Sequence, residues 1–178
     1  MTSRNMNGEE RRRFIVDQLK KSSKPLTGQI LAELTGVSRQ VIVTDIALLR
    51  TAEEPIIATS RGYVYYQNTS QNHLYRKVIV CNHAPEDTKK ELKILVDFGV
   101  TIVDVIVEHP FYGDLAGSLM IKSKSDIDYF IHALNQTVPL SVLTGGLHLH
   151  TLESDSIEKI HSACEALKEA GILVTENR

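Results

Sequence analysis

The sequence predicts an α+β protein in two parts, a mainly helical first domain over residues 1–70 and a mixed second domain over residues 71–178. Apolar residues recur at helical spacing up to about residue 51, whereas short β-branched runs alternate with helical segments from residue 75 onward. Residues 1–70 carry ten Lys or Arg against seven Asp or Glu, and residues 71–178 carry ten against fifteen. This charge difference favours two modules, of which the first is better suited to a polyanion.

Three helices are expected in the first domain. The first runs from Gly8 to Lys21 and begins with a basic cluster at residues 11–13. Positive charge near a helix N-terminus is unfavourable, so the cluster should either lie in solvent or meet a phosphate. Thr27 is a good N-cap for a short second helix over residues 29–34. The side chains expected to face inward from this second helix are Ile30, Leu31 and Leu34.

A tight turn, residues 35–38, connects the second helix to a third that runs from Ser38 to about Thr51. Gly36 can take the left-handed conformation that ends a helix, and Ser38 can cap the next one. A short helix, a turn and a longer helix form the helix-turn-helix pattern, in which the later helix enters the major groove of DNA. The buried side of the third helix is expected to contain Val41, Ile42, Ile46, Leu48 and Leu49.

A β-hairpin follows the third helix. Residues 56–66 form two short apolar runs around Ser60-Arg61-Gly62, and a hairpin at this place makes the first domain a winged helix-turn-helix. Arg61 at the tip could touch the DNA backbone or minor groove, and Gln67 to Asn72 is expected to be a linker. The alternative is a three-helix interaction module with an ordinary polar face. The predicted DNA-binding residues are small or carry hydrogen-bond donors and acceptors suited to bases and phosphates. They are Thr27, Ser38, Arg39, Gln40, Val43, Thr44 and Arg61.

The second domain is expected to alternate β-α-β-β-α-β-α-β, with its helices on one face of a sheet. The loop after the β-branched strand, residues 108–114, is polar and aromatic, and such loops often line a ligand pocket. The expected elements are a strand at 75–81, a helix at 85–98, strands at 100–107 and 115–121, a helix at 123–134, a strand around 147–151, a helix at 157–170 and a closing strand at 172–174.

The segment Gly145-Gly146-Leu147-His148-Leu149-His150 predicts chemistry as well as structure. In a strand, His148 and His150 would share one face, and the two leucines would point to the other face and into a core. Two imidazoles on one face of a stiff strand can form half of a metal site, unless each is simply hydrogen-bonded by itself. Glu91, expected to be half buried beside an apolar helix stripe, needs a partner such as a metal, a histidine or a lysine at the surface.

The composition is that of an ordinary soluble protein, with 42% hydrophobic and 24% charged residues. No apolar run is long enough to span a bilayer, and the N-terminus lacks an apolar signal core, so a cytoplasmic protein without a membrane partner is expected. In that compartment Cys81 and Cys164 should be reduced thiols.

Taken together, these features resemble the niacin-responsive transcription repressors, bacterial proteins with an N-terminal helix-turn-helix and a C-terminal three-histidine domain. The resemblance covers nearly the whole chain. Its marks are the motifs at residues 82–86 (Asn-His-Ala-Pro-Glu), 103–113 (Val-Asp-Val-Ile-Val-Glu-His-Pro-Phe-Tyr-Gly) and 145–151. One minor departure is Phe98-Gly99-Val100, where the family more often has two glycines before the central strand.

The resemblance implies repression of genes for NAD biosynthesis or niacin salvage, with nicotinic acid as co-repressor and a divalent metal in the regulatory domain. By position the metal ligands would be His83, Glu91, His148 and His150, a set that suits zinc, nickel or iron. Cys81, two residues before His83, is a further possible ligand. By the same resemblance, His109 would be the third signature histidine, in the pocket or beside the ligands rather than on the metal. The residues expected near the effector are His109, Tyr112 and Arg76.

One helix-turn-helix makes too little contact for tight specific binding, so a homodimer on a palindromic double-stranded operator is expected. Two alternatives remain at this point. In one, the protein is a repressor for which the metal itself is the signal. In the other it is a metalloenzyme, although the sequence contains no nucleophile elbow and no phosphate-binding glycine loop.

Overall fold

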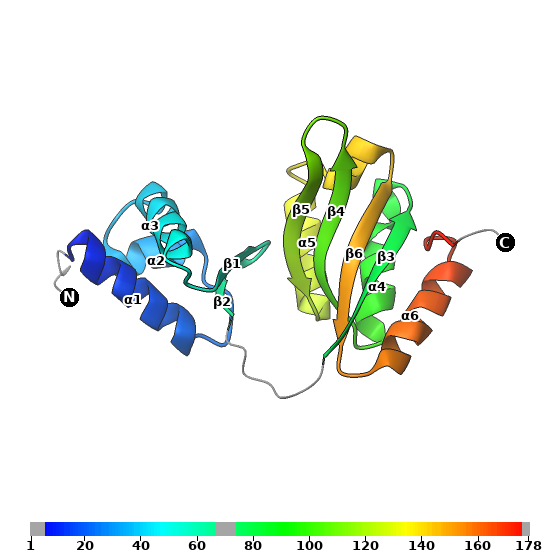
Figure 1. Ribbon diagram of the computed structural model, residues 1–178, viewed down its shortest axis with the longest axis horizontal. Coiled ribbons are helices and arrows are strands. Elements are labelled where there is room, and N and C mark those ends of the chain that lie inside the picture. The colour runs from blue at the N-terminus through cyan, green and yellow to red at the C-terminus, as the bar shows by residue number, and fades with distance from the viewer. Residues whose placement is uncertain (1–5, 67–73, 176–178) are drawn as a thin grey trace. The chain divides into compact units, whose positions relative to one another are not determined.

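The computed structural model describes residues 6–66 and 74–175, and the chain divides into two compact units, Met1–Thr69 and Ser70–Arg178 (Figure 1). The predicted linker, Gln67 to Asn72, lies outside the described residues. None of the helices in the described ranges combines the length and the apolar character that a bilayer-spanning helix needs.

The first unit is the predicted winged helix-turn-helix. Each of its helices begins at a side chain, Asn7, Thr27 or Ser38, that accepts a hydrogen bond from a backbone N–H of the first turn. Gly36 ends the second helix with a φ of 70°, as predicted. The elements are α1 (Gly8–Lys21), α2 (Gly28–Thr35), α3 (Arg39–Thr51) and the antiparallel strands β1 (Ile56–Thr59) and β2 (Gly62–Tyr65).

The core of this unit is smaller than the sequence predicted. Ile15, Leu31 and Ile42 are fully buried at its centre. The prediction that Ile30, Leu34 and Leu48 face inward is wrong, because these side chains are 40%, 48% and 47% exposed. Helix α2 has only eight residues, and its inward side is completed by the small residues Ala32 and Thr35. The Thr35 hydroxyl donates to the Leu31 carbonyl, which removes the cost of burying it.

The basic cluster at the start of α1 has a protein partner. Asp45, buried on α3, binds the Arg11 guanidinium at 2.6 Å and that of Arg12 at 3.4 Å. Arg13 instead pairs with Glu9 of its own helix at 2.6 Å. Two of the three arginines therefore join α1 to α3. The sequence had predicted a solvent-exposed cluster or a contact with phosphate, and not these ion pairs.

The wing is joined to the segment before α2. Leu26 and Tyr63 exchange two backbone hydrogen bonds, of 2.9 and 2.8 Å, so that β2 pairs with Leu26 as well as with β1. Gly62 has a φ of 127°, and a Cβ at this position would lie 2.6 Å from the Leu26 carbonyl oxygen. Only glycine therefore permits this contact between the wing and the segment before α2.

The second unit is a four-stranded antiparallel sheet of order β3-β6-β4-β5, with helices on one face (Figure 1). The predicted order of elements is confirmed except at its end, where residues 172–174 make a single bridge to Cys81 instead of a closing strand. A short 3-10 helix, η2, precedes β6 and was not predicted. The elements are β3 (Tyr75–Asn82), η1 (Pro85–Asp87), α4 (Thr88–Asp97), β4 (Thr101–His109), β5 (Gly113–Ile121), α5 (Lys124–Leu134), η2 (Leu140–Thr144), β6 (Leu147–Ser154) and α6 (Ile157–Glu169).

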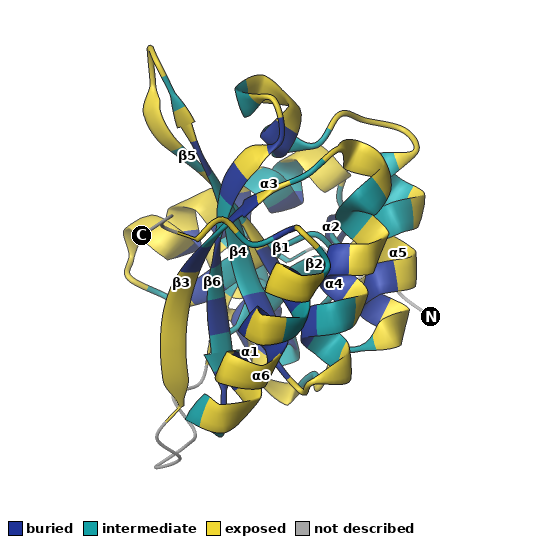
Figure 2. Ribbon diagram, turned by 90° about the vertical axis from the view of Figure 1, so that its right-hand side faces the viewer, coloured by how far each residue is buried: buried dark blue, intermediate teal, exposed yellow. Residues whose placement is uncertain are grey.

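The core of the second unit lies between the sheet and the helices. Ile102 and Leu152 of the sheet pack with Leu95, Ile160 and Leu167 of the helices, and all five are fully buried. The opposite face of the sheet is open, and the first half of β3 is exposed (yellow in Figure 2). Side chains on the helix-covered face are therefore the ones shielded from water.

The ion pairs of Asp45 give a testable prediction. Asp45→Asn removes the negative charge between two arginines and should lower the local unfolding free energy of α1 and α3 by about 2 kcal/mol. Amide hydrogen exchange by mass spectrometry would show faster exchange in these helices and unchanged exchange in β6. Asp17→Asn, at an exposed position of α1, is the matched control. Equal exchange in both variants would contradict a joining role for Asp45.

Candidate functional site

The two histidines of β6 point into the interior. His148 and His150 are 2% and 3% exposed and lie on the helix-covered face, which confirms that they share one side of a strand. The prediction that Leu147 and Leu149 face the core is wrong, since Leu147 is 44% exposed on the open face. The cause is the position of α4, α5 and α6, which cover the histidine side of the sheet (Figure 1).

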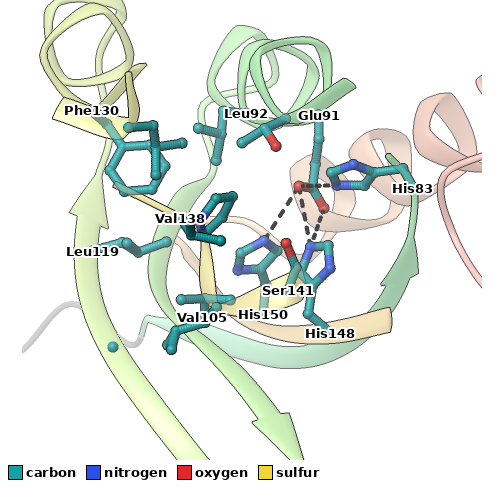
Figure 3. A pocket seen from close by; sticks show the side chains of 15 residues that line it. His83, Glu91, Leu92, Val105, Leu119, Phe130, Val138, Ser141, His148 and His150 are labelled. Carbon is teal, nitrogen blue, oxygen red and sulfur yellow. Dashed lines mark hydrogen bonds and ion pairs between the residues drawn. The ribbon is translucent and has the colours of Figure 1, made fainter. Parts of the chain in front are cut away.

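A buried carboxylate lies at the centre of three imidazoles (Figure 3). Glu91 of α4 is 1% exposed, more deeply buried than expected. Its Oε2 lies 2.8 Å from Nε2 of His83, which follows β3, and 3.5 Å from Nε2 of His150. Its Oε1 lies 3.4 Å from Nε2 of His148. The structure thus brings together all four predicted metal ligands.

Backbone carbonyls determine which ring nitrogen carries the proton. Nδ1 of His83, His148 and His150 lies 2.7, 2.8 and 2.5 Å from a carbonyl oxygen, of Ala84, Gly146 and Asp104 respectively. A carbonyl can only accept, so each Nδ1 must donate. In a neutral imidazole the other nitrogen is then an acceptor. In their neutral forms all three imidazoles would therefore present the lone pair of Nε2 toward Glu91.

With neutral imidazoles this cluster would consist of acceptors without donors. Nε2 of His150 and Oε1 of Glu91 are buried and have no hydrogen-bond partner. Two facing acceptors need a donor or a cation between them, such as protons on the imidazoles, a water molecule or a metal ion. Imidazole ligands whose other nitrogen donates to a carbonyl are the usual arrangement around transition metals. The residues present thus fit a divalent transition metal.

Without a metal ion, the imidazoles of His83 and His150 bind protons more readily than usual. Burial alone would lower the pKa values of His83 and His150, but their interactions with the Glu91 carboxylate outweigh it and raise both above the ordinary 6.5. Burial would likewise raise the pKa of Glu91, yet its interactions with His148, His150 and His83 hold it well below 4.5. The carboxylate therefore stays ionised and attracts a cation.

An irregularity in β4 places one of these carbonyls. Between the pairs Ile102–Leu152 and Ile106–Leu149, β4 has three residues, 103–105, and β6 has two, 150 and 151. At this bulge the Asp104 carbonyl accepts from His150, and its carboxylate accepts from the Thr151 N–H at 2.9 Å. Bulges often direct side chains at functional sites. Sequence reasoning missed this role, although Asp104 was the one interruption of a β-branched run.

Gly146 allows the start of β6, the strand of His148 and His150, to lie close to the His83 backbone. Its φ is 103°, and a Cβ there would lie 2.4 Å from the His83 carbonyl oxygen. A Cβ at Gly145, by contrast, would meet nothing within 4 Å. Of these two glycines, Gly146 therefore makes the close approach.

An apolar pocket of about 200 Å³ opens beside the cluster. Its walls include Leu92, Val105, Leu119 and Phe130, and one end is formed by His83, Glu91, His148 and His150 (Figure 3). Within the described residues neither Lys nor Arg lines it. A pocket with an apolar body and one polar end is typical of a small-molecule site.

The three residues predicted to contact an effector lie outside this pocket. Arg76 on β3 forms an ion pair with Glu153 at 2.6 Å. His109 and Tyr112 lie at the β4–β5 turn, where Nδ1 of His109 accepts from the backbone N–H groups of Phe111 and Tyr112 at 3.1 and 3.3 Å. Their contact with an effector stays a prediction, and the pocket walls were not found from the sequence.

The predicted DNA-binding residues gather at the start of α3, at the start of α2 and on the wing. Thr27 and Ser38 are helix caps, and Arg39 and Gln40 are exposed in the first turn of α3. The Arg39 side chain lies over Gly28, whose missing side chain leaves room for it. The remaining predicted contacts are Val43, which is partly buried, Thr44, which is exposed, and Arg61, which is partly buried between β1 and β2.

Comparison with known proteins identifies the class. Residues 76–176 match the model of the 3H domain, and residues 11–64 match that of an HTH domain. The chain is 47% identical to "Transcription repressor NadR" of Bacillus subtilis (strain 168) over 172 residues, which cover 95% of this chain and 96% of that protein. The chain belongs to the niacin-responsive transcription repressor family. It is also 42% identical to "Probable transcription repressor NiaR" of Thermotoga maritima over 170 residues, 94% of this chain and 95% of that protein.

Membership in the niacin-responsive repressor family confirms the resemblance found in the sequence motifs. The family consists of transcription regulators, so the metalloenzyme alternative is excluded. The helix-turn-helix unit is correspondingly a DNA-binding domain.

The close approach at Gly146 can be tested with its neighbour as control. Both glycines have positive φ, so Gly145→Ala should cost about 1 kcal/mol of unfolding free energy from backbone strain. Gly146→Ala adds a clash with the His83 carbonyl and should cost about 3 kcal/mol or more. Urea unfolding followed by far-UV circular dichroism measures both. Equal losses would mean that the His83 segment moves away at little cost.

Proposed function

We propose that this chain is a cytoplasmic, homodimeric repressor of NAD-biosynthesis or niacin-salvage genes, with nicotinic acid as co-repressor. In this proposal a divalent transition metal, zinc, nickel or iron, is held by His83, Glu91, His148 and His150. The observation that carries it is the apolar pocket that ends at an acceptor-only cluster, in a family named for its response to niacin.

The pocket chemistry suits a small aromatic carboxylate. Leu92, Leu119 and Phe130 offer apolar contact to a flat ring. The carboxylate of nicotinic acid needs a positive partner, and the described lining contains no Lys or Arg. A metal at the imidazole end would supply that charge, and could equally receive the pyridine nitrogen. His83, His148 and His150 would be held for this by the carbonyls that fix their Nδ1 protons.

Repression requires that effector and DNA favour the same state of the dimer. Nicotinic acid strengthens operator binding by no more than the ratio of its affinities for two states of the dimer, the one that binds DNA and the one that does not. That arrangement would place both α3 helices in successive major grooves, about 34 Å apart.

Metal removal is the first test of this proposal. Titration calorimetry should show that nicotinic acid binds the zinc-loaded protein at least about tenfold more tightly than the chelator-treated protein. His148→Ala should abolish the difference, while His161→Ala, an exposed histidine of α6, should keep it. Unchanged nicotinic acid affinity after metal removal would rule out a metal-anchored effector.

A gel shift with operator DNA separates this proposal from a metal-sensing repressor. A shift that needs nicotinic acid supports the co-repressor function, whereas a metal-dependent shift that ignores nicotinic acid supports the sensor. Both arms use the same protein and the same DNA.

The recognition helix yields a second prediction. Arg39→Ala should weaken specific operator binding by about 1–3 kcal/mol if the guanidinium contacts a base, with little effect on non-specific DNA. Arg50→Ala, in the last turn of α3, should change both affinities much less. Fluorescence anisotropy with operator and scrambled duplexes gives both numbers. Equal weakening on the two duplexes would make Arg39 a phosphate contact.

A further inference from the structure

A buried thiol lies beside the imidazole cluster. Cys81 of β3 is fully buried and pairs in register with His148 of β6. Neighbours in register have their side chains on the same face of a sheet, so the thiol and the imidazole lie together on the helix-covered face. One ligand atom each of Cys81, Glu91 and His148 lies within 4.8 Å of the others, the one such group among the described residues.

The same space contains buried polar atoms without partners. Oε1 of Glu91 and Nε2 of His150 form no hydrogen bond, although both residues are at least 97% buried. A cysteine that merely fills a core needs no such neighbours. Cys81 and Cys164 both belong to the apolar core of the second unit, but within the described ranges Cys81 is part of a ligand group and Cys164 is not.

A thiol that binds a metal ion loses its proton and coordinates the ion as a thiolate. The reaction balances, since the metal ion takes the sulfur lone pair and one proton goes to solvent.

We propose that Cys81 is a further ligand of this metal site and binds the ion as a thiolate through Sγ. This inference rests on the proposed metal site. A thiolate beside imidazoles also agrees with the transition metals proposed above and disfavours harder ions such as magnesium.

Cobalt(II) is the probe, since it takes the place of zinc and is coloured. The chelator-treated full chain is titrated with cobalt(II) chloride and its absorption spectrum recorded. Bands in the visible region report cobalt bound by any ligand, and a thiolate-to-cobalt charge-transfer band in the near ultraviolet reports the sulfur. Wild type and Cys164→Ser should show both, whereas Cys81→Ser should lose the near-ultraviolet band.

Proton release is the second readout. Zinc titration calorimetry in buffers of different ionisation enthalpy should show that wild type releases about one proton more per zinc than Cys81→Ser. Visible bands without a charge-transfer band in wild type would overturn the role of Cys81 and leave the metal site standing. Cobalt that does not bind at all would overturn the metal site as well. The proposal would also be overturned if Cys81→Ser kept the charge-transfer band, or if it released as many protons per zinc as wild type.

Discussion

The second unit depends on the convergence of one buried carboxylate and three imidazole lone pairs. A buried ionised group must be compensated, and in the part of the chain that the structure describes Glu91 forms its ion pairs with His83, His148 and His150. The strand alternation of β6, the bulge in β4 and the glycine before β6 each serve this arrangement. Each either directs an imidazole toward Glu91 or fixes the proton on its far nitrogen.

The first unit handles its buried carboxylate in the opposite way. Asp45 is satisfied inside the unit by Arg11 and Arg12, so no outside cation is needed. The result is a fixed relation between α1 and α3 that leaves the first turn of α3 exposed. Since each unit has a core of its own, loss of a ligand from the second unit need not unfold the first. Regulation would then act on the arrangement of folded units.

Local patterns predicted the elements well, and long-range contacts account for what they missed. Caps at Thr27 and Ser38, the turn at Gly36 and the shared face of His148 and His150 follow from neighbouring residues. The alternation of β6 could not say which side the helices would cover, and so Leu147 was assigned to the wrong one. The partner of Arg11 lies 34 residues away along the chain. The walls of the pocket come from several separate segments, so that no single segment of the sequence predicts it.

The extra residue in β4 has a consequence for how this domain can vary. Deleting Val103 or Val105 would give β4 and β6 the same number of residues between their two paired positions, which by itself favours regular pairing of these two strands. It would also turn the Asp104 carbonyl away from His150 and free that ring to change its tautomer. The length of this strand is therefore tied to the chemistry of a side chain on its neighbour. Insertions and deletions should be tolerated in the β4–β5 turn long before they are tolerated here.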